Sequence, residues 1–432
     1  MSKRAASLLL LTLLLCVLPA LASASEPVQR DATGDAAASP TRGHEEGLSV
    51  AAVPTLSFNT DEGFGTGGVG TLYHRADGVL PYKNAWTLKL FISTKLIQSH
   101  RLEWDALDPW GLPLRTFARV GFYNTMTQNF CGFGNAVRCD PALVERVADV
   151  HGLAPGSERR DDFVRHYYAM RFMRFYGDAA ARYRLRKAPH KLEAVAGWRG
   201  NYYLPGEFSE LGPYPGSLYA ETFPDGEPGF SSQLFGGLTL DDRDHETFPT
   251  RGYYIEALVR GAAWWTGSAW DYSGGNLSLA LFHSLLRQPR VVLAMRFLGD
   301  GMLGDPPTED LARVGGLDDA IAFGGHAIGR GVREHRYLGK LKLINQLELR
   351  GQFYDVTLLE QELSFGAATF YDVAWIGYDL ADLRGDARTL LAGAGVSFRF
   401  LWNRDFTVRF DLGFSPHERF APGIYIMVGN AF

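Results

Sequence analysis

Ionisable side chains are concentrated between residues 241 and 252, where aspartates and arginines lie close together. If this stretch is extended, Asp242, Asp244 and Glu246 fall on one face, and carboxylates grouped in that way could bind calcium. The other interpretation is a strand end and a turn, in which arginines pair with the acids. We favour the turn, and we expect no metal site. The residues that define it are Asp241, Asp242, Arg243, Asp244, Pro249, Arg251 and Gly252.

No set of side chains matches a familiar catalytic arrangement. His283 and Ser284 are adjacent, so in a strand they point to opposite faces and cannot share a proton. His326 and His335 lie in a glycine-rich segment that has no nucleophile signature, and their spacing is a poor signal for a metal. The sequence therefore predicts a protein that is not an enzyme and holds no cofactor.

Composition limits the class of protein. The chain has 432 residues, of which 46% are apolar and 13% aromatic, with a formal net charge of −5. This aromatic content is too high for a disordered chain, and the charge argues against nucleic acid as a partner. Beyond the N-terminus no apolar run approaches the roughly 18 residues of a membrane-spanning helix. A soluble protein and a membrane β-barrel both remain possible, because alternating strands average to neutral hydropathy.

The N-terminus indicates export. Lys3 and Arg4 precede an apolar run, and Ala22-Ser23-Ala24 supplies a cleavage pattern, so we expect residues 1–24 to be a signal peptide. Residues 25–48 are predicted to be a disordered periplasmic tail, and residues 49–432 one folded domain. In the oxidising compartment that follows export, Cys131 and Cys139 are predicted to form a disulfide.

Segments with a period of two recur from residue 48 to the end of the chain. Between Phe406 and Ser415, for example, apolar residues alternate with threonine, arginine, aspartate, glycine and serine. This alternation gives each strand one apolar and one polar face. Helical periodicity is best in residues 141–150, and without helices between strands there is no parallel sheet. The fold class is therefore all-β.

Three features favour a barrel in a membrane over a soluble sandwich. The apolar phases are rich in aromatics, and short connections such as 403–405 alternate with long ones such as 299–339. The chain also ends on an amphipathic strand, Ile424 to Phe432. We expect a transmembrane antiparallel β-barrel of about 16 strands, closed because an open edge in lipid is costly. The aromatics concerned are Trp86, Trp264, Trp375 and Trp402.

Several motifs together resemble a known family. The stretch from Gly236 to Asp244 (GGLTLDDRD), followed by FPTRG at Phe248 to Gly252, is similar to the "LDTRD…FPTRG" signature of the BamA/TamA superfamily, the bacterial surface antigens. Weaker matches lie in a loop, a late strand and the terminal strand. The resemblance covers about residues 48 to 432 and implies a long sixth outer loop folded into the lumen. The matching residues are Ile328 to Gly331, Phe370 to Asp372, and Val428 to Phe432.

The loop motif of that family carries an arginine that pairs with carboxylates on the barrel wall. The resemblance gives this role to Arg330, which precedes Gly331, and the alternation turns Glu348 and Asp372 toward the lumen. A guanidinium between two carboxylates suits bidentate, charge-assisted hydrogen bonds. We expect these residues to anchor the loop. The alternative is an ordinary lumenal ion pair with no bearing on gating.

The last strand allows two interpretations at each of two positions. Gly429 predicts a kink that weakens pairing with the first strand and makes a lateral seam, or it is simply a small lumen-facing residue. Phe432 resembles the terminal aromatic that the outer-membrane assembly machinery recognises. It also suits an aromatic girdle at the membrane boundary, and both can hold.

Two functions follow as expectations. The barrel aids insertion or translocation of a client polypeptide or lipid through the seam, or it is a passive channel or surface antigen barrel. The tail is too short for the POTRA domains with which the family's insertases receive clients. We expect a monomer in the outer membrane of a Gram-negative bacterium, whose partners are outer-membrane lipid and a periplasmic partner protein or client.

Overall fold

The structure is a computed structural model that describes most of the chain after residue 45. The predicted signal peptide lies outside the described residues, as does the predicted tail up to residue 45. Gly47 and Leu48, which we assigned to the tail, belong to the first strand. The described ranges are 46–76, 79–134, 139–187, 190–206, 216–246, 248–287, 290–358, 361–379, 382, 390–402 and 406–432.

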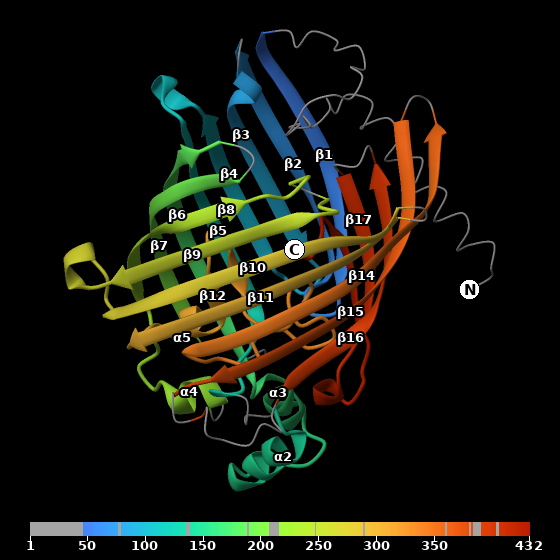
Figure 1. Cartoon of the computed structure of the whole chain (residues 1–432). Helices are drawn as coiled ribbons and strands as arrows, with labels where there is room; N and C mark the ends of the chain where they lie inside the picture. The colour runs from blue at the N-terminus through green and yellow to red at the C-terminus, as the bar shows by residue number, and fades with distance from the viewer. Residues whose placement is uncertain are drawn as a thin grey trace.

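Within these ranges, sixteen antiparallel strands close into one barrel, which confirms the predicted fold class (Figure 1). Each strand pairs with its neighbours in the chain, except that β11 pairs with β14 across an inserted segment and β1 pairs with β18 to close the ring. The first half comprises β1 (Gly47–Asn59), β2 (Gly63–Ala76), β3 (Val79–Ser93), β4 (Gln98–Leu107), β5 (Leu114–Asn129), β6 (Ala169–Arg186), β7 (Lys191–Gly206) and β8 (Gly229–Asp241). The second half comprises β9 (Gly252–Ala262), β10 (Tyr272–Arg287), β11 (Arg290–Gly304), β14 (Leu341–Leu358), β15 (Gln361–Gly377), β16 (Leu391–Trp402), β17 (Phe406–Phe414) and β18 (Gly423–Val428).

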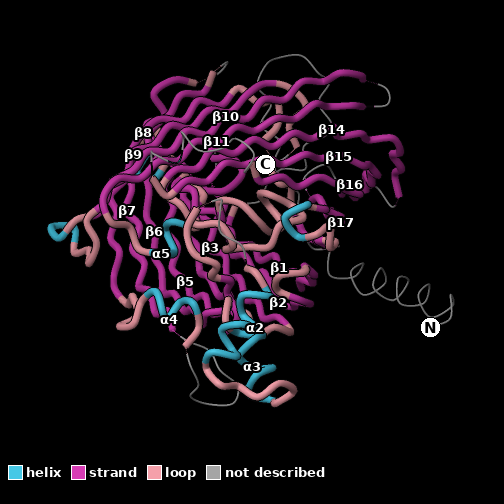
Figure 2. The backbone as a smooth tube through the Cα atoms, turned by 90° about the horizontal axis from the view of Figure 1, so that it is seen from below, coloured by secondary structure: helices cyan, strands magenta, loops and turns pink. Residues whose placement is uncertain are grey.

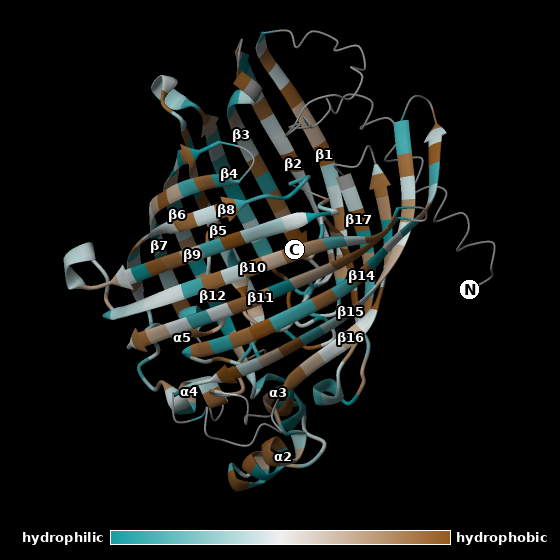
Figure 3. Cartoon of the chain, viewed as in Figure 1, coloured by the Kyte–Doolittle hydropathy of each residue, from teal (hydrophilic) through white to brown (hydrophobic). Residues whose placement is uncertain are grey.

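The alternation along each strand sorts side chains between the outer surface and the lumen. On β14, Leu343 and Leu349 are 45% and 44% exposed on the outside, whereas Lys342, Gln346 and Glu348 are no more than 1% exposed. Apolar and polar residues accordingly alternate along the strands in Figure 3. An apolar exterior and a polar interior are the arrangement of an outer-membrane barrel.

The two ends of the barrel differ. At the short-turn end the connections are brief, since β10 ends at Arg287 and β11 begins at Arg290. At the long-loop end, which is the lower end in Figure 1, long segments join β5 to β6 and β11 to β14. This end also carries α2 (Pro141–Val150), α3 (Glu158–His166), α4 (Leu218–Thr222) and the 3-10 turns Trp264–Thr266 and Pro416–Glu418, whereas the 3-10 turn Pro109–Gly111 joins β4 to β5 at the short-turn end.

The loop between β5 and β6 contains both a confirmed prediction and a correction. Helix α2 occupies the segment whose periodicity was helical, and Cys131 and Cys139 form the expected disulfide, with their Cα atoms 5.3 Å apart. The alternation from residue 163 onward predicts a strand that starts there, but β6 begins only at Ala169, because residues 158–166 form α3. The side chain of Ser157 caps that helix by accepting a hydrogen bond from the Arg160 amide.

No helix in the described ranges combines the length and the apolar character needed to cross a membrane.

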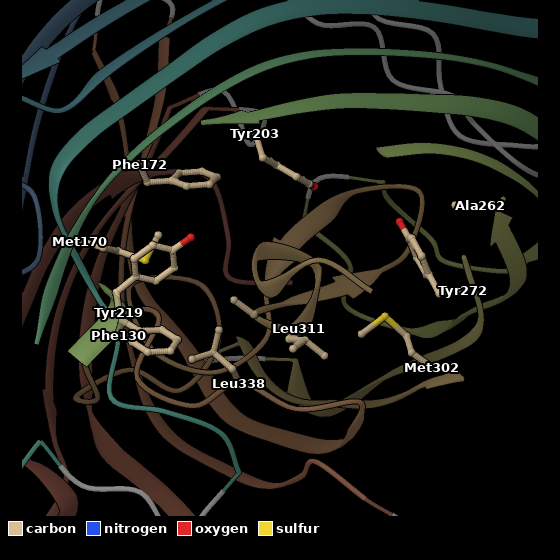
Figure 4. Packing of buried hydrophobic residues seen from close by; sticks show 11 residues of the cluster. Phe130, Met170, Phe172, Tyr203, Tyr219, Ala262, Tyr272, Met302, Leu311 and Leu338 are labelled. Carbon is tan, nitrogen blue, oxygen red and sulfur yellow. The ribbon is translucent and has the colours of Figure 1, made fainter. Parts of the chain in front are cut away.

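The segment between β11 and β14 enters the lumen, and Figure 2 shows its backbone inside the ring of strands. It forms α5 (Thr308–Leu311) and a small hairpin of β12 (Arg313–Gly315) and β13 (Asp319–Ile321). We call residues 305–340 the lumenal loop. Where it enters, an apolar cluster packs loop residues against the barrel wall (Figure 4). This cluster includes Phe130, Met170, Phe172, Tyr203, Tyr219, Leu311 and Leu338.

Candidate functional site

Arg330 lies inside the barrel, against its wall, and is fully buried. Its backbone N and its Nε both donate to Asp372 Oδ2 at 3.0 Å, and Nη2 donates to Asp372 Oδ1 at 3.1 Å. Its Nη1 donates to Glu348 Oε1 at 2.5 Å. A buried charge is tolerated only when it is paired and hydrogen-bonded, and this guanidinium meets that condition from two neighbouring strands, β14 and β15.

Further charged side chains surround Arg330 and its two carboxylate partners. Glu348 also accepts hydrogen bonds from Arg350 and Arg399, each at 2.7 Å. Arg409 on β17 pairs with Asp411 and donates through Nη2 to the carbonyl oxygen of His326 in the lumenal loop, at 2.7 Å. The guanidiniums of Arg330, Arg350, Arg399 and Arg409 thus face the carboxylates of Glu348, Asp372 and Asp411.

Gly331 brings the loop into close contact with the last two strands. Its φ is +95°, and a Cβ built on it would lie 2.6 Å from the Phe414 amide nitrogen. Its own N–H donates to the hydroxyl of Tyr425 on β18, at 3.0 Å. Sequence reasoning did not single out Tyr425, although its place in the inward phase of an otherwise apolar strand was the signal that could have found it.

A second set of contacts, which the sequence did not reveal, holds the beginning of the lumenal loop. Asp310 in α5 accepts hydrogen bonds from Tyr203 Oη at 2.6 Å, from Gln233 Nε2 at 3.0 Å and from Tyr272 Oη. These three partners come from β7, β8 and β10. The loop is therefore attached to a different part of the wall from the one that Arg330 contacts.

The β12–β13 hairpin strengthens this second attachment. Arg199 on β7 donates through Nη2 to the carbonyl oxygens of Gly316 and Leu317, both at 3.1 Å. Asp319 pairs with Arg174 on β6 at 3.3 Å, and the amide of Gly315 donates to Asp300 at 3.0 Å. We call these contacts, together with those of Asp310, the α5 anchor, and those of Arg330 the Arg330 anchor.

The charged stretch at residues 241–252 forms the connection between β8 and β9 at the short-turn end. Arg243 pairs with Asp241 at 2.8 Å, and Asp244 accepts hydrogen bonds from the amides of Thr250 and Arg251 at 2.8 and 3.0 Å. Asp242 turns away toward His190, at 3.0 Å. Gly252, which follows Pro249 and Arg251, has a φ of +98°, and a Cβ there would collide with the Asp242 carbonyl oxygen. The carboxylates thus have separate partners, and within the described ranges no three metal-ligating side chains converge.

The seam between β1 and β18 is much shorter than the other strand pairings. Among the residues that the structure describes, its ladder contains only Phe58 opposite Ile426 and Asn59 opposite Tyr425. The amide of Thr60 extends it by donating to the Ile424 carbonyl at 3.1 Å. On its other side, β1 pairs with β2 along its whole length, from Gly47 to Asn59.

The chain leaves the barrel wall at Gly429 and turns into the lumen. Gly429 has a φ of +90°, and its amide donates to the Thr407 carbonyl at 2.8 Å. Phe432 lies against the guanidiniums of Arg296 and Arg350, whose Cζ atoms are 5.0 and 4.9 Å from the ring centroid, instead of at the outer boundary. Nη2 of Arg350 also donates to the Phe432 backbone oxygen at 3.0 Å.

A cavity of about 720 Å³ remains in the lumen. Leu317 and Ile328 of the lumenal loop line one side of it, and Phe432 lines another. Arginines and carboxylates of the wall, such as Arg115 and Glu103, supply polar surface. The loop and the turned-in end of the chain therefore occupy part of the lumen and border the space that remains.

The carboxyl group of Asp61 lies where the first hairpin meets the tip of the lumenal loop. Asp61, in the turn between β1 and β2, has its pKa raised from 3.8 to about 8 by burial and by the nearby charge of Glu334. Glu62 beside it also has a raised pKa, again because of burial and Glu334. Packing the loop tip against this turn therefore favours a protonated Asp61.

Comparisons with known proteins agree with this architecture. Residues 173–432 match the family model described as the Omp85 superfamily domain. The fold is similar to that of CdiB from Escherichia coli, with a TM-score of 0.58 and 12% identity over 96% of this chain and 69% of that one. It is also similar to BamA from Haemophilus ducreyi lacking POTRA domains 1–3, with a TM-score of 0.53 and 10% identity over 89% of this chain and 70% of that one. At such identities the two structures show a shared fold alone, and no curated protein matches this sequence.

Proposed function

The chain belongs to the Omp85 superfamily and is an outer-membrane β-barrel, and from this premise we propose that it aids insertion or translocation of a client polypeptide or lipid through the seam between β1 and β18. The observation that carries this proposal is the two-residue ladder between these strands. Each unpaired backbone group in lipid costs several kcal/mol, so a seam closed at one end only is the weakest line in the wall.

The free edge of β1 supports a polypeptide as the client. From Gly47 to Ser57 this edge faces away from β2, lies outside the β1–β18 ladder, and has no other strand beside it among the residues that the structure describes. Such an edge presents donors and acceptors on which another extended segment can form hydrogen bonds. A client strand that pairs here would satisfy its own backbone as it enters the bilayer.

The filled lumen argues against the alternative of a passive channel. Two anchors hold the lumenal loop across the barrel, one through Arg330 to β14 and β15 and the other through Asp310 to β7, β8 and β10. In this proposal the Arg330 anchor, which consists of Arg330, Gly331, Glu348 and Asp372, keeps the loop in the lumen. It thereby maintains the permeability barrier while β1 and β18 separate. Gly429 and Phe432 belong to the terminal segment next to the seam, and this segment moves when the seam opens.

The partners follow from the same proposal. The outer surface contacts outer-membrane lipid, and the client or a periplasmic partner approaches from the short-turn end. There the β8–β9 connection, with Asp241 to Asp244 and Pro249 to Gly252, is exposed enough for contact, since the Arg251 side chain is 70% exposed. The barrel acts as a monomer, and it assists assembly in the membrane instead of catalysing a chemical reaction.

Assisted folding into vesicles tests this function. The probe is a urea-unfolded eight-stranded outer-membrane barrel, which is diluted into vesicles with or without this protein and followed by its heat-modifiable electrophoretic band. We expect folding to be at least several times faster in the vesicles that contain the protein. Equal rates in empty vesicles, and in vesicles that contain an unrelated porin, would contradict the proposal.

A further inference from the structure

The free edge of β1 contains a proline at a position where the seam would need an N–H. Pro54 lies in the middle of β1, and it faces Gly68 within an unbroken register with β2. Proline has no backbone N–H, so its nitrogen can face only a side of the strand where no ladder bond is made.

The hydrogen bond at Thr60 identifies that side. The amide of Thr60 donates across the seam to Ile424, and the backbone groups of a strand alternate between its two neighbours with a period of two. Pro54 is an even number of residues away, and no bulge interrupts β1, so its nitrogen also faces the seam. The side chains of β1 support this regularity, because alternate residues from Leu48 to Leu56 are exposed on the outer surface.

The register of the seam determines what would lie opposite Pro54. Phe58 pairs with Ile426, and partners in an antiparallel ladder advance in opposite directions. Two further steps of two residues place Asn430 opposite Pro54. The carbonyl of Asn430 would then face a nitrogen that cannot donate, and inside the bilayer it would have no water to replace the missing hydrogen bond.

The observed ladder with β1 ends at Phe58 and Ile426, and the chain turns away from the wall at Gly429, one residue before Asn430. Beyond that point the terminal segment finds partners inside the lumen. Asn430 Oδ1 accepts a hydrogen bond from Arg399 at 3.2 Å, and the Phe432 ring packs against Phe282, with centroids 6.3 Å apart. The segment thus has two possible places, the β1 edge and the lumen, and Pro54 disfavours the first.

We propose that Pro54 is a built-in stop that keeps the β1–β18 ladder from extending to Asn430 and thereby directs residues 429–432 into the lumen, which leaves the β1 edge between Leu48 and Leu56 free. The stop itself is independent of any client. A client strand could pair with Leu48, Val50 and Ala52 before it reaches the same proline. This consequence for a client rests on the proposed function.

Disulfide trapping in the full chain tests the stop. In the observed register Val53 would face Ala431 across the seam at a non-hydrogen-bonded pair, where Cβ atoms are close enough for a disulfide. With Val53→Cys and Ala431→Cys, we expect little cross-linking when Pro54 is present and at least about tenfold more cross-linking with Pro54→Ala. The native cysteines Cys131 and Cys139 are already joined to each other.

A matched pair controls for folding and oxidation. Ser57→Cys with Met427→Cys lies next to the observed ladder, so it should cross-link equally with Pro54 and with Pro54→Ala. If Val53 and Ala431 cross-link no better in Pro54→Ala while the control pair still does, the proposal is overturned.

A second variant keeps the test open if Pro54→Ala does not fold. Leu56→Pro places a new stop one ladder step closer to the observed pairs, and it should reduce cross-linking of the Ser57 and Met427 cysteines severalfold. Unchanged cross-linking in Leu56→Pro would equally overturn the proposal. Because both measurements report strand pairing and not client folding, failure of the stop is distinguishable from failure of the proposed function.

Discussion

The guanidinium of Arg330 lies against the aromatic ring of Phe370, with its Cζ 3.7 Å from the ring centroid. Phe370 is two residues before Asp372 on β15, so the same strand supplies both the carboxylate that pairs with the guanidinium and the ring that covers it. Planar stacking and bidentate pairing are both properties of arginine that lysine lacks. The identity of this residue therefore matters, and not merely its charge.

Replacing Arg330 should loosen the tip of the lumenal loop. Arg330→Ala leaves the Asp372 carboxylate buried without its main partner, and breaking a buried ion pair in this way costs roughly 3–5 kcal/mol. We expect faster tryptic cleavage at Arg333, whose side chain is 56% exposed. Arg330→Lys should be intermediate, and adding Asp372→Asn to Arg330→Ala should recover part of the loss. Wild-type cleavage rates in Arg330→Ala would show that the contact does not anchor the loop.

Loss of one anchor should not open the pore. Arg330 and Asp310 contact different strands of the wall, and distant sites with no shared partners contribute independently. In planar bilayers we expect small conductance for the wild type, for Arg330→Ala and for Asp310→Ala. The double variant should show a large and steady conductance. A large conductance in either single variant would mean that one anchor alone holds the plug.

The contact between the loop tip and the first hairpin should weaken as pH rises. Asp61 has a pKa raised to about 8 when packed, so the contact is fully stable below the ordinary value of 3.8 and is lost as pH rises through about 8. The charged neighbours are Glu62, Lys95, Arg333 and Glu334. As pH rises toward 8, the equilibrium constant for opening this contact should increase by up to about tenfold per pH unit. Above pH 8 it should level off.

Tryptic cleavage of the loop tip measures this pH effect. The rate for the wild type is divided at each pH by the rate for Asp61→Asn, which cancels the pH dependence of the protease. We expect the ratio to climb between pH 6 and pH 8. A ratio that stays flat over this range would show that Asp61 does not control the contact.

The inward and outward faces of the strands were predictable because a period of two is a local property of the sequence. It placed Glu348 and Asp372 toward the lumen without any knowledge of the loop. The position of Arg330 came from the resemblance to a family, since no periodicity places a loop residue inside a barrel.

Other features could not be predicted from local patterns. Asp310 lies in a short segment without periodicity, and its partners Tyr203 and Tyr272 are distant in the sequence and adjacent only after the barrel closes. Continued alternation through Val428 would direct Phe432 outward, as expected for a girdle. The positive φ of Gly429 turns the chain in the other direction. Glycine can adopt this conformation, but its presence in the sequence does not require it.

Locking the seam tests its role most directly. Cysteines at Ser57 and Met427 join β1 to β18 and change no residue of the lumenal loop, and the vesicle assay with the urea-unfolded eight-stranded barrel gives the readout. We predict that the oxidised variant loses the acceleration, that reduction restores it, and that the wild type is unaffected by the same reductant. Full acceleration by the oxidised, cross-linked barrel would contradict a working seam.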